Sequence, residues 1–302
     1  MSGPPASLVP TITADWELDY YSRPIVDADG KKRWDLLICS TPTPLEGGGE
    51  AHPPFRWELI CPAGSVNSIW LRQALEEALA AAAAAGFAPP RRLRCWRGSM
   101  RTMVQRAAEG LGLELVPSRR CYALVRWLQE REASVYPAEP GYLAGPLAPP
   151  PAPPRPLAVP LPEAARGESW DWATLPLEAL AAAPGWEVGF AGLLPVPTNL
   201  DPQLPVPGIR LFSRQRALAI AGWLAGLEPV RLAISDRQLV LEAGLDDRWL
   251  LATLPAEEAE AAATALVAAR EQGGGLQFIA VQSSESEPAL SGFWLLQDLP
   301  DA

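Results

Sequence analysis

The chain has 302 residues, 48% of them hydrophobic and 20% charged, a balance that excludes an intrinsically disordered protein. A chain of this length buries about three-quarters of its unfolded surface and usually divides into more than one domain. The net charge of −10 argues against a protein whose whole surface binds nucleic acid or anionic membranes, although it is compatible with a local basic patch.

The first half predicts three strands followed by helix, strand, helix, strand and helix. Asp27-Ala28-Asp29-Gly30 is typical of a hairpin turn between the first two strands, and Asn67 or Ser65 caps the first helix. The strands are 16–25, 32–39, 55–61, 91–96 and 113–116, and the helices are 67–85, one capped by Ser99 and one starting at Ser118. This order is typical of a ribonuclease H-like domain, which we expect over residues 1–142.

The middle of the chain is rich in proline. Nine of the twenty residues from Leu143 to Pro162 are proline, which excludes a helix or a central strand there. We expect a semi-rigid Pro/Ala-rich linker over residues 143–168, partly in polyproline II conformation. A PxxP ligand for a partner domain is the alternative interpretation.

Residues 169–302 predict a second domain with a mixed sheet and flanking helices. The predicted strands are 186–194, 230–235, 238–245, 249–253, 276–281 and 293–297, and the predicted helices are 214–225 and 256–272. The predicted fold class is therefore α/β, in the mixed α+β sense, with two domains.

Few residues suit catalysis or a metal. His52 is the only histidine, so the sequence supports neither a multi-histidine metal site nor a Ser-His-Asp triad. The triplet Gly47-Gly48-Gly49 follows no strand-to-helix pattern, which leaves nucleotide binding without support. We expect no cofactor and no metal. The cysteines at positions 39, 61, 95 and 121 have no CxxC spacing, which favours a reducing cytoplasm.

A metal-dependent nuclease is the catalytic alternative. Two-metal nucleases on a ribonuclease H-like scaffold need carboxylates on the first strand, the first helix and the fourth strand. Asp19 and either Glu76 or Glu77 supply the first two, but the fourth strand carries arginines and no acid. We therefore expect a binding protein rather than an enzyme, in which Asp19 is a hairpin or surface carboxylate that pairs with Arg23 or Arg33.

A basic and aromatic cluster lies between residues 91 and 126, which hold nine arginines and two glutamates. Guanidinium groups for phosphates beside rings for unpaired bases suit single-stranded RNA. Arg97 also precedes a predicted helix N-terminus, which favours a phosphate. The predicted RNA contacts are Arg94, Trp96, Arg97, Arg101, Arg119, Arg120, Tyr122 and Arg126. Alternatively, these arginines pair with the protein's own carboxylates and the tryptophans are core residues.

Several long strings resemble the Tab/Atab family. In the first half they are WELDYYSRP at 16–24, RCWRGSMRTM at 94–103 and PSRRCY at 117–122. In the second half they are DPQLPVPGIR at 201–210, AGWL at 221–224, FIAVQS at 278–283 and GFWLL at 292–296. The resemblance implies an RNA-binding protein of oxygenic phototrophs that supports translation of photosystem reaction-centre messages, chiefly those of photosystem I.

The resemblance also sets the expected partners and location. The partners are single-stranded RNA, as an mRNA leader, and translation or photosystem-assembly proteins. We expect no signal or transit peptide and no membrane insertion, hence a cytoplasmic protein of cyanobacterial type. The alternative function is a scaffold that binds photosystem subunits through the acidic second domain and Phe293-Trp294, without contacting RNA.

Overall fold

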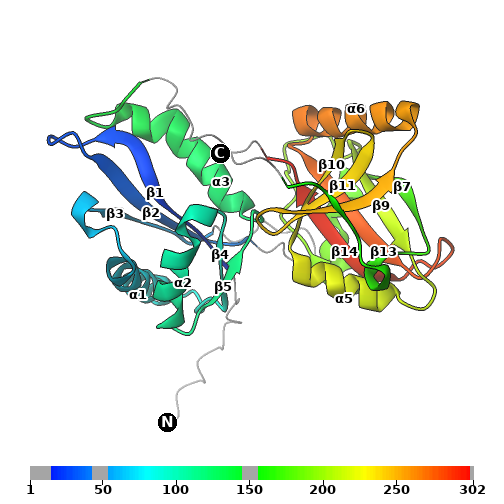
Figure 1. The fold of residues 1–302 in the computed structure, drawn as a ribbon, viewed down its shortest axis with the longest axis horizontal. Helices are drawn as coiled ribbons and strands as arrows, with labels where there is room; N and C mark the ends of the chain where they lie inside the picture. The colour runs from blue at the N-terminus through cyan, green and yellow to red at the C-terminus, as the bar shows by residue number, and fades with distance from the viewer. Residues whose placement is uncertain (1–14, 43–53, 145–155, 300–302) are drawn as a thin grey trace, which may run out of the picture. The chain divides into compact units, whose positions relative to one another are not determined.

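The computed structural model describes residues 15–42, 54–144 and 156–299 (Figure 1). These residues form two units: the first holds 15–41, 54–117 and 123–144, and the second holds 42, 118–122 and 156–299. His52, the glycine triplet 47–49 and the N-terminal stretch on which the absence of a signal peptide was judged lie outside the described residues. No helix within the described ranges combines the length and apolarity needed to cross a membrane.

The first unit has one five-stranded sheet in the order β3-β2-β1-β4-β5. β1 and β2 pair antiparallel, as do β2 and β3, whereas β4 is parallel to both β1 and β5. The strands are β1 (Trp16–Val26), β2 (Lys32–Ser40), β3 (Arg56–Cys61), β4 (Arg92–Cys95) and β5 (Glu114–Pro117). The helices are α1 (Ser68–Ala84), α2 (Arg101–Glu109) and α3 (Tyr122–Glu130). The predicted order of elements is confirmed; the ribonuclease H-like assignment stays a prediction.

Two local predictions in this unit are confirmed. At the hairpin between β1 and β2, an Asp27 carboxylate oxygen accepts hydrogen bonds from the backbone N–H groups of Asp29 at 3.0 Å and Lys31 at 2.8 Å. Gly30 supplies the positive φ of 74° that this turn requires. At the start of α1, Asn67 caps the helix by accepting from the N–H groups of Ile69 and Trp70.

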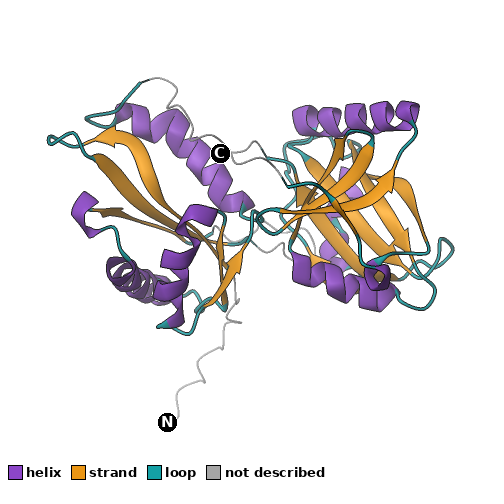
Figure 2. Cartoon of the chain, in the orientation of Figure 1, coloured by secondary structure: helices purple, strands orange, loops and turns teal. Residues whose placement is uncertain are grey.

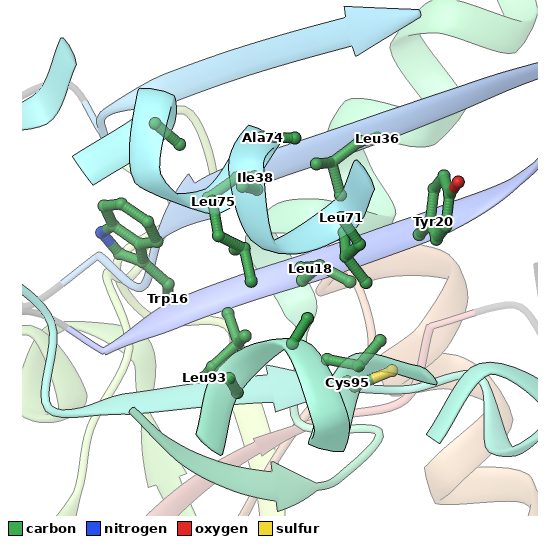
Figure 3. Close-up of a cluster of buried hydrophobic side chains, with 14 of the residues drawn as sticks. Trp16, Leu18, Tyr20, Leu36, Ile38, Leu71, Ala74, Leu75, Leu93 and Cys95 are labelled. Atoms are coloured by element: carbon green, nitrogen blue, oxygen red, sulfur yellow. The ribbon is translucent and has the colours of Figure 1, made fainter. Parts of the chain in front are cut away.

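The core of the first unit lies between the sheet and α1. Because side chains alternate along a strand, Trp16, Leu18 and Tyr20 point to one face of β1, where Leu71 and Leu75 of α1 cover them (Figure 3). α1 and α2 lie on this face, and α3 covers the opposite one (Figures 1 and 2). The buried polar residues of β1 therefore face α3.

α3 begins at Tyr122, so the predicted start at Ser118 is wrong. The Ser118 hydroxyl accepts from the backbone N–H of Arg120 at 2.9 Å, and the N–H of Arg119 donates to the Gly244 carbonyl at 2.9 Å. These bonds hold 118–121 in a turn outside the helix. The Ser99 cap is wrong too: Ser99 lies in a 3₁₀ turn, and α2 begins at Arg101 without a side-chain cap.

The second unit contains two sheets, in the orders β7-β9-β13-β14-β8 and β10-β11-β12-β6. Their strands are β6 (Val159–Pro160), β7 (Ser169–Pro176), β8 (Val188–Gly192), β9 (Pro205–Phe212), β10 (Pro229–Ser235), β11 (Gln238–Ala243), β12 (Asp247–Thr253), β13 (Leu276–Gln282) and β14 (Leu290–Gln297). The helices are α4 (Leu177–Ala181), α5 (Ala217–Leu227) and α6 (Ala256–Gln272). The two faces of the five-stranded sheet carry separate apolar clusters.

Part of the segment predicted as a linker packs on the second unit. Val159–Pro160 forms an edge strand on β12, and Leu161 and Ala165 are buried. An edge position suits Pro160, which has no N–H to donate. Residues 145–155 of the predicted linker lie outside the described residues, and its exact limits stay a prediction.

Candidate nucleic-acid interface

The carboxyl end of β4 leads into Trp96 and Arg97. Because β4 runs parallel to β1, these residues lie beside Tyr21 of β1. The Arg97 guanidinium carbon is 4.1 Å from the ring centroid of Tyr21 and 4.1 Å from that of Trp96. Both rings therefore make cation–π contacts with one arginine.

Asp19 forms an ion pair with Arg97. Its side chain is fully buried, and its carboxylate lies 2.5 Å from Nε of Arg97 and 2.8 Å from Nη2 of Arg23. The predicted pairing of Asp19 with Arg23 is confirmed, but a surface position for Asp19 is wrong, because its carboxylate is buried beside these two arginines. Arg33 instead pairs with Asp35 at 2.9 Å. Asp19 thus holds the Arg97 guanidinium against the rings of Tyr21 and Trp96. The Arg97 side chain keeps an exposed fraction of 20%.

The carboxylates of the nuclease alternative do not converge. Glu76 and Glu77 are exposed on α1, which covers the face of β1 opposite to Asp19. Across the described ranges no group of three or more His, Cys, Asp or Glu residues is placed to hold a metal. The structure therefore does not assemble the three carboxylates that this alternative needs.

Arg92 and Arg94 join β4 to the start of β1. Nη2 of Arg92 is 2.6 Å and Nη1 of Arg94 is 3.0 Å from the Asp15 carboxylate, and Arg94 also donates to the Thr41 hydroxyl at 3.4 Å. Arg94 is buried, with an exposed fraction of 5%. Its observed contacts therefore hold β4 to the start of β1.

α2 presents cations to solvent. Val104, Ala107 and Ala108 face the core, which leaves Arg101 and Arg106 exposed on the other side of the helix. Within the described part of the chain neither guanidinium has a salt bridge or hydrogen bond. Arg97 is followed by the exposed Gly98 and Ser99, and Arg101 comes two residues after Ser99. We call Tyr21, Trp96, Arg97, Arg101 and Arg106 the β4–α2 surface.

The thiol next to this surface is inert at neutral pH. Burial raises the pKa of Cys95 to about 11, although a backbone hydrogen bond with Arg97 acts in the opposite direction. A neutral buried thiol is a poor nucleophile and metal ligand. All four cysteines are buried and free.

Three of the predicted RNA contacts belong to the second unit. Arg120 donates to the carbonyls of Pro229 at 2.8 Å, Gly192 at 2.7 Å and Leu295 at 3.0 Å. The Tyr122 hydroxyl donates to the Val230 carbonyl at 2.7 Å. A phosphate contact by Arg120 would need these bonds to open.

Arg119 and Arg126, the remaining predicted contacts at positions 117–126, also belong to different units. Arg119 pairs with the buried Glu242 at 2.8 Å and lies outside α3, so it does not share a helix face with Arg126. Arg126 itself is half-buried on α3 of the first unit. The structure therefore brings Trp96, Arg97 and Arg101 together along one stretch of chain, and places Arg119, Arg120 and Tyr122 inside the second unit.

Sequence reasoning did not select Tyr21 and Arg106 as site residues. Tyr21 lies two residues after Asp19 and so shares its strand face, but its contact with Arg97 depends on the parallel pairing of β1 with β4. Arg106 belongs to the recognised run of arginines, and its exposure follows from the helical spacing of Val104 and Ala107.

Phe293 and Trp294 are buried, with exposed fractions of 1% and 3%. They form part of β14, with Phe293 facing one apolar cluster and Trp294 the other. The scaffold alternative therefore loses the exposed Phe293-Trp294 contact that it assumed.

Exposed arginines that follow arginine-stacked rings along the chain, on a mixed α/β scaffold in two parts, are typical of a protein that binds nucleic acid. The chain belongs to the Tab2/Atab2 family of RNA-binding proteins. Residues 15–131 match the family described as "RNA-binding protein Tab2/Atab2 N terminal", and residues 148–297 match "RNA-binding protein Tab2/Atab2, C-terminal domain".

Two plant proteins are similar over nearly the whole chain. A protein of Zea mays named "Protein TAB2 homolog, chloroplastic" is 34% identical over 96% of this chain and 73% of its own length. A protein of Arabidopsis thaliana with the same name is 32% identical over 95% of this chain and 75% of its own length. No solved structure matches the chain significantly.

Proposed function

We propose that the chain binds single-stranded RNA through the β4–α2 surface. The observation that carries this proposal is the pair of exposed arginines, Arg101 and Arg106, without carboxylate partners in the described ranges, just after the Tyr21–Arg97–Trp96 stack. Membership of an RNA-binding family supports it independently.

Each part of the surface has a separate role. Arg101 and Arg106 contact phosphates, because an exposed guanidinium forms charge-assisted hydrogen bonds without first losing a protein partner. The half-exposed rings of Tyr21 and Trp96 stack on unpaired bases, and Arg97, held by Asp19, keeps both rings in place. Because a duplex does not offer its base faces, this arrangement favours a single strand.

The other predicted contacts are Arg94, Arg119, Arg120, Tyr122 and Arg126, and they stay predictions. Their side chains are buried or half-buried, and all five interact with groups of the protein itself. Of the contacts predicted from the sequence, the proposal therefore assigns direct contacts to Trp96 and Arg101 and a positioning role to Arg97.

The biological role proposed here is support for synthesis of photosystem reaction-centre subunits, chiefly those of photosystem I, through binding of an mRNA leader. The family resemblance carries this part of the proposal, and translation or assembly proteins are its proposed partners. Four free buried thiols agree with the proposed location in a reducing cytoplasm.

The deciding experiment is a fluorescence-anisotropy titration of the protein against labelled oligouridylate, matched single-stranded DNA and duplex RNA at several salt concentrations. Each phosphate contact to a single strand contributes about −0.7 to the slope of log affinity against log salt. Arg101→Ala with Arg106→Ala should reduce the slope by about 1.4 and weaken RNA binding about tenfold at low salt.

The matched control is Arg214→Ala with Arg237→Ala, at two exposed arginines of the second unit. It should leave the salt slope and the RNA affinity unchanged. Equal effects of the two double variants would show that only net charge matters. Absence of RNA binding by the unaltered protein at low salt would overturn the proposed function itself.

A further inference from the structure

A pocket of about 850 Å³ opens on the second unit, on one face of the β7-β9-β13-β14-β8 sheet. Phe278 and Ala280 of β13 and Phe293 of β14 form its floor, and Trp186 forms a wall. Glu187 and Arg210 lie at its polar edge. All of its lining residues belong to this unit.

Aromatic contacts shape the pocket. The rings of Phe278 and Phe293 stack at 5.6 Å between centroids, and Trp186 meets Phe293 edge to face at 5.0 Å. Gly208 makes room for this floor, because a Cβ there would come within 2.5 Å of the Phe278 ring. Phe278, Ala280 and Phe293 are themselves buried, so the apolar lining that meets solvent comes from the half-exposed Trp186, Leu175 and Leu290.

The second unit as a whole carries an excess of negative charge. Residues 156–299 contain 18 acidic and 8 basic side chains. Glu187 is exposed at the edge, and the exposed Asp171 lies 3.4 Å from Arg210, the cation that lines the pocket. Field lines from these carboxylates favour a cationic ligand and oppose phosphate.

One buried donor at the edge has no partner. Nε of Arg210 is buried and makes no hydrogen bond, while Nη2 of the same side chain is only at the limit of hydrogen-bond distance from Asp171. An unpaired N–H beside an apolar surface suits the carbonyl oxygen of a peptide backbone.

We propose that this pocket docks a peptide segment of another protein that combines apolar side chains with lysine or arginine. The apolar side chains pack against Trp186, Leu175 and Leu290 above the buried floor, the cation approaches Glu187 and Asp171, and a backbone carbonyl accepts from Arg210 Nε. A nucleobase with its phosphate fits less well, since the pocket has one cation and that cation already faces a carboxylate. This site is separate from the RNA surface proposed above.

The test uses the full chain and fluorescein-labelled octapeptides. The probe LFLKRLFL should bind saturably, whereas the acidic peptide LFLEELFL and the polar peptide GSGKRGSG should bind at least tenfold more weakly. Trp186→Ala should weaken binding of the probe about tenfold, because it removes an aromatic side chain that lines the pocket. Glu187→Lys should weaken it about fivefold at low salt, and less at high salt.

The matched control is Glu178→Lys, which changes an exposed glutamate of α4 outside the pocket lining and should not alter peptide affinity. Failure of the unaltered chain to bind the probe, or equal losses from both glutamate variants, would overturn the proposal. Displacement of the probe by a twelve-residue oligouridylate would overturn it in favour of RNA. The variant Arg101→Ala with Arg106→Ala should bind RNA more weakly but the peptide probe with unchanged affinity, which separates the two proposals.

Discussion

Buried charge in the second unit is concentrated on two carboxylates, each held by arginines. Arg231 lies 2.8 Å from Glu242 and 2.6 Å from Asp298. Arg119 also reaches Glu242, and Arg270 reaches Asp298. Burial acts to raise the pKa of Glu242, but the attraction of Arg231 and Arg119 and the hydrogen bonds that they donate outweigh it and lower the pKa below its ordinary value. Removing one member would leave a buried charge uncompensated.

This arrangement predicts a pH dependence of stability. The folded pKa of Glu242 lies below its unfolded value, so its ionised form stabilises the fold above about pH 5, and this contribution is lost as pH falls through the lowered pKa. Urea unfolding from pH 6 to pH 3 should show a smaller loss of unfolding free energy in Glu242→Gln than in the unaltered chain. Glu260→Gln, at an exposed position, should keep the full loss, and identical pH slopes in all three proteins would contradict the assignment.

At the scale of elements, α1 depends on its cap and on one apolar stripe. Its sequence is rich in alanine, and Leu71, Ala74, Leu75, Ala78 and Ala82 are the residues that it buries. Few large side chains thus anchor seventeen residues, and the first turn contains no acidic residue. The two hydrogen bonds of Asn67 therefore have a larger share in the stability of this helix than a cap usually has.

Replacing Asn67 tests this point. Asn67→Ala should lower the free energy of unfolding by about 1 kcal/mol, because the N–H groups of Ile69 and Trp70 lose their acceptor. Asn67→Asp should preserve stability, since aspartate caps equally well. Chemical denaturation followed by circular dichroism measures both, and a neutral Asn67→Ala would show that packing alone fixes the start of α1.

Most elements could be predicted from the sequence because their apolar spacing and end signals are local. β7 and β9 were missed, β9 because Pro205 and Pro207 are unusual in an interior strand. The structure accommodates them because β9 pairs with β13 only from Gly208 onwards. The start of α3 was misplaced since Ser118 has the side chain of a helix cap but uses its hydroxyl inside a turn.

At the scale of the whole molecule, the sequence identified the type of residue, arginines beside aromatic rings. It did not show that these arginines divide between two units and differ in their partners. The sequence shows nine arginines between 91 and 126, but not which carboxylate or carbonyl each one meets after folding. Arg97 is stacked between rings, Arg101 is exposed and Arg120 is buried among carbonyls. Such differences depend on pairings between residues as far apart as Arg120 and Leu295, which no local pattern reveals.

Arg120 should therefore matter for stability first. Arg120→Ala leaves the carbonyls of Pro229, Gly192 and Leu295 without this donor and should destabilise the second unit by about 3 kcal/mol or more. Arg214→Ala, at an exposed position, should change stability by less than about 0.5 kcal/mol. Thermal unfolding measures both, and a fully stable Arg120→Ala protein with weakened RNA binding would instead favour the direct contact predicted from the sequence.

The short segment 118–122 has a consequence for how such a protein is inherited. It completes the second unit with the Arg120 guanidinium and the Tyr122 ring, yet it lies upstream of residue 148, where the match to the C-terminal family description begins. A gene fragment encoding only the later half would specify a body with a gap in its apolar cluster and three carbonyls deprived of a donor. Recombination that separates the halves should therefore be selected against, and they should pass between genomes as one reading frame.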